Sequence, residues 1–318
     1  MKQLDLCGAW TLTQEGSKGS FPATVPGCVH TDLLAAGAIE DPFYRDNEAK
    51  LQWIADADWI YERTFQAEDL PAFDRVLLRC EGLDTIATVT LNGTELGTAD
   101  NMYRTWEFDI KAVLKTGRNT LAIRFESPLK YIERHAEGKR ALPGWSAPHE
   151  TRLRPWIRKE PCSFGWDWGP VLTSSGIWRP IEIVAFNTVR ITDLRIRQDH
   201  SRFKQGIVGL DIDAAAEIRP GAGPLEALCR VFYKGGVIAD ARGEWTDGKA
   251  SLHIDVRNAQ LWWPAGLGDQ PLYEVALDVQ RERVNLAHAA RRIGLRTLRL
   301  DRHADEWGES FQFAVNGV

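Results

Sequence analysis

Residues 86–93 have the sequence IATVTLNG and show the pattern that decides the fold of this chain. Apolar and polar side chains alternate from Ile86 to Leu91, as in a β-strand with one buried face, and Asn92-Gly93 is a preferred hairpin dipeptide. The alternation recurs at Val76–Cys80, Thr105–Ile110, Thr120–Glu126, Trp178–Ala185 and Val189–Arg197. Turn residues, not regular helices, separate these runs. The first part of the chain is therefore predicted to be an all-β antiparallel sandwich.

Two segments favour short helices within this β pattern. One is His30–Ala38, and the other is Pro128–Lys139, where Pro128 suits a first helical turn and Ser127 suits the cap before it. We expect both helices to decorate the sandwich.

A second β-rich segment runs from about residue 188 to residue 300. Its expected strands are Gly206–Ala214, Leu225–Tyr233, Ala250–Val256, Leu272–Val279 and Ala290–Leu298. The length of this segment, about 110 residues, suits a seven-strand immunoglobulin-like sandwich.

The last residues, Phe311–Val318, read as one strand followed by an Asn-Gly turn, which normally leads into a partner strand. An isolated hairpin arm does not stabilise itself in water. We therefore expect this chain to be the front portion of a longer polypeptide.

Composition excludes several classes of function. The 318 residues carry a net charge of −5, so the chain has no basic footprint for nucleic acid. Five cysteines without CxxC spacing favour neither a disulfide framework nor a metal site. The sequence has no signal-like opening and no apolar run of about 18 residues. We expect a cytoplasmic protein that does not interact with membranes.

Residues 159–169, KEPCSFGWDWG, carry the strongest functional signal. One carboxylate, Asp167, stands between the indoles of Trp166 and Trp168. Flat aromatic faces cover the C–H patches of a pyranose, while a charged acceptor takes neighbouring hydroxyls. Flanking glycines and prolines favour a loop on which all three side chains converge. The alternative is a pair of core tryptophans with Asp167 capping a turn.

Positive charge is concentrated directly before this block, in Arg152–Lys159. One of its arginines is expected to orient Asp167 through a bidentate pair.

Several motifs together resemble one known family, the β-mannosidase branch of the glycoside hydrolases that also contain β-galactosidase and β-glucuronidase. They are Pro26-Gly27 with His30-Thr31-Asp32-Leu33, Asp58-Trp59-Ile60-Tyr61, Leu91-Asn92-Gly93 with Leu96-Gly97, the Trp166-Asp167-Trp168 block, Leu261-Trp262-Trp263-Pro264 with Leu272-Tyr273, Arg292-Ile293-Gly294-Leu295-Arg296, and Val315-Asn316-Gly317. The resemblance implies a jelly-roll, galactose-binding-like sandwich at residues 1–187 and an immunoglobulin-like sandwich at residues 188–300. Residues 301–318 would then open a catalytic (β/α)8 barrel that is otherwise missing.

The resemblance also implies a function. The family's retaining β-mannosidases remove terminal β-D-mannose without metal or organic cofactor, using two barrel glutamates. Such chemistry needs two carboxyl groups about 5–5.5 Å apart. Because both glutamates would lie on the missing barrel, this chain would contain no catalytic residue and would be inactive alone. Its part would be to bind the β-mannoside oligosaccharide, with Asp167 bonding mannose hydroxyls and Trp166 and Trp168 forming the pocket wall. Asn47-Glu48 resembles the acid/base dipeptide, but its polar surroundings predict a solvated loop.

Two other interpretations remain open. The chain is a self-standing carbohydrate-binding or scaffold module, or it has the same architecture with β-galactoside, β-glucuronide or glucosaminide specificity. Trp262 and Trp263 are expected to pack against the barrel. If the barrel is absent, exposure of these two indoles would favour a homodimer.

Overall fold

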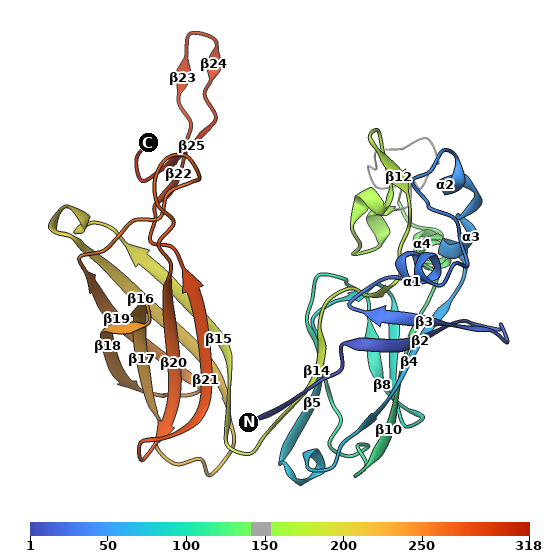
Figure 1. Cartoon of the computed structure of the whole chain (residues 1–318), viewed down its shortest axis with the longest axis horizontal. Helices are drawn as coiled ribbons and strands as arrows, with labels where there is room; N and C mark the ends of the chain where they lie inside the picture. The colour runs from blue at the N-terminus through green and yellow to red at the C-terminus, as the bar shows by residue number, and fades with distance from the viewer. Residues whose placement is uncertain (141–153) are drawn as a thin grey trace. The chain divides into compact units, whose positions relative to one another are not determined.

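The computed structural model describes residues 1–140 and 154–318, which form two compact units (Figure 1). One unit is Lys2–Phe186, and the other is Asn187–Val318 together with Met1. The strands within each sheet pair antiparallel. The predicted all-β class is confirmed.

The first unit is a sandwich of a four-stranded sheet, β1-β14-β5-β9, and a six-stranded sheet, β3-β2-β4-β10-β7-β8. The first sheet contains β1 (Lys2–Asp5), β14 (Ile181–Phe186), β5 (Arg75–Cys80) and β9 (Trp106–Asp109). The second contains β3 (Ser20–Val25), β2 (Gly8–Gln14), β4 (Trp59–Gln66), β10 (Arg118–Phe125), β7 (Ala87–Leu91) and β8 (Thr94–Ala99). Alternate side chains of both sheets, including Leu78 and Ile123, fill one core.

Two predicted helices exist, and both are shorter than expected. They are α1 (Val29–Ala35) and α4 (Pro128–Ala136), and Ser127 Oγ caps α4 by accepting a bond from Lys130 N at 3.2 Å. Left-handed glycines end them early, because Gly37 and Gly138 have φ of 67°. The single-turn helices α2 (Asn47–Lys50) and α3 (Trp53–Asp56) were not predicted. Short 3₁₀ turns lie at η1 (Leu70–Ala72), η2 (Arg154–Trp156) and η3 (Pro161–Ser163).

The second unit pairs a three-stranded sheet, β15-β16-β19, with a four-stranded sheet, β18-β17-β20-β21. Its strands are β15 (Val189–Asp199), β16 (Ile207–Ile218), β19 (Lys249–Arg257), β18 (Gly236–Glu244), β17 (Glu226–Tyr233), β20 (Tyr273–Arg281) and β21 (Val284–Ile293), and η4 (Phe203–Gln205) precedes β16. This strand set confirms the predicted immunoglobulin-like sandwich, whose core includes Leu210, Val231 and Leu277.

The strands of this unit differ from the prediction in two places. The edge strand β18 was missed, because most of its side chains are exposed and leave a weak apolar pattern. The last strand is Val284–Ile293, not Ala290–Leu298. Glu282 and Arg283 make the preceding turn with φ of 52° and 66°, a conformation that glycine or asparagine normally signals.

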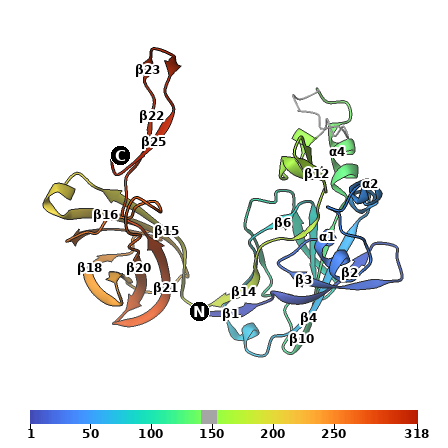
Figure 2. The same cartoon turned by 45° about the horizontal axis from the view of Figure 1, so that its top comes forward.

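The chain ends in a hairpin that projects beyond the second sandwich (Figure 2). Its base is β22 (Leu298–Asp301) paired with β25 (Gln312–Val315), and its tip is β23 (Ala304–Asp305) paired with β24 (Gly308–Glu309). The predicted strand at the end of the chain exists, and it pairs with β22, which precedes it. Asn316 fastens the base, since its Nδ2 donates to Trp262 O at 3.0 Å and its Oδ1 accepts from Thr297 N at 2.9 Å.

Candidate functional site

The Trp-Asp-Trp block forms a β-hairpin, not the predicted loop. Strand β11 (Phe164–Trp166) pairs with β12 (Gly169–Val171), with Trp166 opposite Gly169. Asp167 and Trp168 make the two-residue turn. We call residues 164–171 the Trp-Asp-Trp hairpin. Its turn presents the carboxylate and one indole at a tip.

The three predicted binding residues are accessible at this tip. The rings of Trp166 and Trp168 lie 6.1 Å apart at an interplanar angle of 51°. Trp168 is 76% exposed, Asp167 is exposed, and Trp166 is half-buried. A core tryptophan pair is therefore excluded. Among the residues that the structure describes, the Asp167 carboxylate has neither a hydrogen bond nor an ion pair.

In residues 154–159, the described part of the basic stretch before the hairpin, no arginine makes the predicted pair with Asp167. The Arg154 guanidinium lies 5.8 Å from the Trp166 ring centroid, a cation–π contact, and bonds Pro161 O at 3.4 Å. Neither Arg154 nor Arg158 pairs with Asp167. Arg152 and Leu153, the first residues of the predicted cluster, lie outside the described residues.

A small apolar cluster includes the first residue of the hairpin and supports it. Phe164, at its first position, is buried with Ile132 of α4 and Ile157, and Leu129 and Tyr131 pack against them. A two-stranded hairpin is marginal in water by itself. This core supplies the buried apolar area that the hairpin lacks.

Glu48 of helix α2 and Gln52, which directly precedes α3, hold the second strand of the hairpin, β12. Glu48 Oε1 accepts from Val171 N at 2.8 Å, and Gln52 Nε2 donates to Val171 O at 2.9 Å. Asn47 is buried, and its Nδ2 donates to Asp41 O at 3.0 Å. The prediction of a solvated loop at Asn47-Glu48 is thus wrong, because both side chains are bonded to backbone groups. Glu48 anchors the hairpin.

A buried ion pair holds the segment that carries the hairpin. Lys159 Nζ donates to Asp84 Oδ1 at 2.6 Å and to Ser174 O at 2.8 Å. Asp84 lies on the short strand β6 (Leu83–Asp84), which pairs with β13 (Gly176–Ile177). No motif in the sequence pointed to this pair, since its members are 75 positions apart.

His30 lies in the same buried region. Burial, followed by the charge of Lys159, lowers the pKa of His30 from 6.5 to about 4, and Asp84 partly opposes the shift. Its Nδ1 is buried and has no hydrogen-bond partner within residues 1–140 and 154–318. His30 is therefore neutral at physiological pH.

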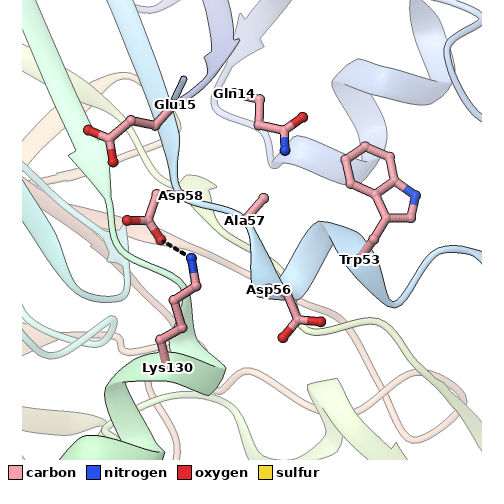
Figure 3. A pocket seen from close by; sticks show the side chains of 7 residues that line it. All are labelled: Gln14, Glu15, Trp53, Asp56, Ala57, Asp58 and Lys130. Atoms are coloured by element: carbon pink, nitrogen blue, oxygen red, sulfur yellow. Dashed lines mark hydrogen bonds and ion pairs between the residues drawn. The ribbon is translucent and has the colours of Figure 1, made fainter. Parts of the chain in front are cut away.

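A separate pocket of about 280 Å³ lies in the first unit and includes none of the predicted binding residues (Figure 3). It is lined by Gln14, Glu15, Trp53, Asp56, Ala57, Asp58 and Lys130. Arg124 binds Glu15 through two hydrogen bonds of 2.8 Å and also pairs with Asp58. Lys130 Nζ lies 3.5 Å from Asp58. These ion pairs indicate a structural junction where β2, β4, β10 and α4 meet.

Other site types are not found in the described part of the chain. Residues 1–140 and 154–318 contain no group of three or more His, Cys, Asp or Glu placed to hold a metal ion. No helix in these ranges has the length and apolarity needed to cross a membrane. All five cysteines are free, and burial raises the pKa of Cys229 to about 12.

Family models match both units. Residues 10–179 match the model described as "Glycosyl hydrolase 2 galactose-binding domain-like", and residues 189–296 match "Glycosyl hydrolases family 2". The chain belongs to glycosyl hydrolase family 2. The resemblance seen in the sequence is confirmed at this level.

Similar proteins of this family include β-mannosidases. The chain is 32% identical, over 98% of its length, to β-mannosidase B of Emericella nidulans. Its structure matches the β-D-mannosidase of Dictyoglomus thermophilum with a TM-score of 0.89 at 34% identity over the whole chain. An exo-chitosanase of Amycolatopsis orientalis, at 19% identity over the whole chain and a TM-score of 0.74, shares the fold. The chain spans 37%, 39% and 36% of these three proteins, respectively.

Proposed function

We propose that this chain is the non-catalytic N-terminal region of a retaining β-mannosidase and supplies part of its mannose-binding pocket. Asp167 bonds hydroxyls of the terminal β-D-mannose, and Trp166 and Trp168 form the pocket wall. The observation that carries the proposal is the exposed Asp167, which has no protein partner in the described residues and sits in a turn between two indoles. The similarity to β-mannosidases over nearly the whole chain supports this choice of sugar.

The chemistry of the hairpin tip suits a pyranose. An ionised carboxylate has only acceptor positions, so it selects a ligand that offers hydroxyl donors. Such charge-assisted bonds are shorter and stronger than neutral ones. The exposed Trp168 offers an apolar face for the sugar's C–H groups. Binding and orientation are what these residues contribute.

The bond-breaking groups belong to another part of the enzyme in this proposal. Retaining hydrolysis uses one protonated carboxylic acid and one ionised carboxylate as nucleophile, and a glycosyl-enzyme intermediate links the two steps. We assign these to two glutamates of a barrel that residues 301–318 open. No metal or organic cofactor takes part. The 318-residue chain alone should therefore show no turnover of an aryl β-mannoside.

Substitution of Asp167 in the complete enzyme tests the assignment. Losing one charged hydrogen bond costs about 1.5–3 kcal/mol, so Asp167→Ala should lower kcat/KM for an aryl β-mannoside roughly ten- to a hundredfold. Asp240 is a matched control, because it is an exposed aspartate of β18 in the other unit. Asp240→Ala should leave kcat/KM unchanged. Equal kinetics of the Asp167 variant and the wild type would refute the role of Asp167.

Two measurements separate this function from its alternatives. A panel of aryl β-mannoside, β-galactoside, β-glucuronide and β-glucosaminide substrates reports the specificity of the complete enzyme, and we expect the mannoside to have the highest kcat/KM. Calorimetric titration of the 318-residue chain with mannose oligosaccharides tests for a self-standing binding module. Such a module would bind with a Kd of about 1 mM or tighter, whereas part of a pocket should bind more weakly.

A further inference from the structure

One carboxylate connects the two ends of the segment that carries the Trp-Asp-Trp hairpin. Lys159 directly precedes residues 160–173, and Ser174 directly follows them. Lys159 Nζ donates to Asp84 Oδ1 at 2.6 Å, and Ser174 Oγ donates to Asp84 Oδ2 at 2.6 Å. Both ends of the segment therefore meet on the same side chain of the sandwich.

The two ends also contact each other. Lys159 Nζ donates to Ser174 O at 2.8 Å and to Ser174 Oγ at 3.1 Å. Thr85 Oγ1 donates to Asp84 Oδ1, so both carboxylate oxygens are bonded. The side-chain polar atoms of Asp84, Lys159 and Ser174 thus all have hydrogen-bond partners, which favours one arrangement of the two ends.

The charged pair of the cluster is closed to solvent, and Ser174 is half-buried beside it. The side chains of Lys159 and Asp84 are 0% and 3% exposed. Salt hardly screens a buried pair, unlike a surface ion pair. An arrangement of this kind is costly to break on one side, because the remaining charge stays buried without a partner.

We propose that Asp84, Lys159 and Ser174 form a clamp that positions the Trp-Asp-Trp hairpin for its ligand. We call these three residues the Asp84 clamp. Closing the ends of a segment restricts its conformations, and binding groups act well only when held within about 0.5 Å of the productive geometry. Asp84 touches no substrate and is a positioning residue. The inference rests on the proposed function, since it concerns the same sugar site.

Asp84→Asn tests the clamp, because it removes the charge at nearly constant volume and leaves the β6–β13 backbone pairing in place. Asp278→Asn is the matched control. Asp278 is also a buried carboxylate, 1% exposed, paired with Arg230 and with His288 Nδ1 at 2.8 Å, but it lies in the second unit. Both variants should lower the melting temperature of the protein.

Only the Asp84 variant should act on the hairpin. In hydrogen exchange of the 318-residue chain, Asp84→Asn should speed amide exchange across residues 160–173 by about tenfold or more, while Asp278→Asn leaves it unchanged. In the complete enzyme, Asp84→Asn should raise KM for an aryl β-mannoside about tenfold and change kcat much less. Wild-type exchange across residues 160–173 in Asp84→Asn would overturn the clamp.

A double variant serves if Asp84→Asn fails to fold. Lys159→Met with Asp84→Leu replaces the ion pair with apolar groups of similar size, a change that proteins often tolerate. It should fold and still show fast exchange across residues 160–173. A folded double variant with a protected hairpin would contradict the clamp.

The outcomes also separate the clamp from the proposed function. If Asp84→Asn frees the hairpin without changing KM, and Asp167→Ala also leaves KM unchanged, the clamp stands and the sugar site is elsewhere. If Asp167→Ala impairs the enzyme while Asp84→Asn affects neither exchange nor KM, the sugar site stands and the clamp is wrong.

Discussion

Two hairpins of this molecule differ in how they are held. The Trp-Asp-Trp hairpin is supported by the buried Phe164, by Glu48 and Gln52 on Val171, and by the Asp84 clamp. The hairpin at residues 298–315, which we call the C-terminal hairpin, is fastened at its base through Asn316.

The C-terminal hairpin leaves one apolar face uncovered. Leu298 lies opposite Val315, and Leu300 lies opposite Phe313, so these side chains share a face. Phe311 and Phe313 contact edge to face with centroids 6.0 Å apart. Leu298, Leu300, Phe311 and Phe313 are all exposed. The Trp-Asp-Trp hairpin is therefore positioned by contacts within the first unit, whereas the C-terminal hairpin presents an apolar surface suited to association.

Breaking the clamp should have the largest effect on the first hairpin. Lys159→Met leaves Asp84 buried without its counter-charge, which should lower the free energy of unfolding of the first unit by about 3–5 kcal/mol. Urea unfolding of the 318-residue chain measures this loss. The double variant with Asp84→Leu should recover most of it. A loss below about 1 kcal/mol for Lys159→Met alone would show that the pair contributes no more than a surface ion pair.

Acid should weaken the same region through His30. Its pKa is about 4 when folded and 6.5 in the reference state, so between these values the unfolded chain binds a proton that the folded chain does not. Stability should therefore fall as pH falls from 6.5 to 4, by roughly 3 kcal/mol for this group. His30→Gln should flatten this part of the stability profile measured by urea unfolding. Equal slopes in variant and wild type would contradict the assignment to His30.

The Glu48 anchor should contribute less than the clamp. Glu48→Gln weakens one charge-assisted bond to Val171 N and retains a side-chain acceptor, so a loss of about 1 kcal/mol is expected. Hydrogen exchange should show faster exchange of the Val171 amide and little change in the sheets of the sandwich. Glu62→Gln, at an exposed position of β4, is the control. If both variants exchange alike at Val171, the carboxylate of Glu48 does not anchor the hairpin.

Substitutions on the C-terminal hairpin should change stability least. Phe311→Ser and Phe313→Ser alter exposed side chains, so the free energy of unfolding should shift by less than about 0.5 kcal/mol. The two substitutions should instead reduce self-association of the chain. We expect the chain to form a homodimer as its concentration rises, as measured by analytical ultracentrifugation, and the double variant to remain monomeric. A wild-type chain that stays monomeric would contradict association through this face.

The sequence predicted the sandwiches because many of their strands alternate buried and more exposed side chains. Ile123 and Leu78 are apolar positions of alternating runs, and they lie in the core. The motif that places Asp167 between two indoles lies at an exposed hairpin tip where a loop was predicted, and its role in binding remains a prediction. Local patterns were enough for these features, since neighbouring residues determine them.

The sequence did not reveal what holds the tip. Asp84 and Lys159 are distant in the chain, and neither residue type predicts burial. Glu48 was read as solvated because its surroundings are polar, but the fold brings Val171 N to its carboxylate. The turn at Glu282-Arg283 lacks glycine, so the start of β21 was misplaced. Such features depend on tertiary contacts that a single sequence does not show.

The most direct test of the sugar site compares Asp167→Ala with the wild type on single-deoxy aryl β-mannosides in the complete enzyme. If Asp167 bonds neighbouring hydroxyls, removing either of those hydroxyls should lower kcat/KM of the wild type by about tenfold or more and barely affect the variant. The remaining deoxy substrates should affect both enzymes equally. A variant that loses as much as the wild type on every deoxy substrate would contradict recognition of mannose by Asp167.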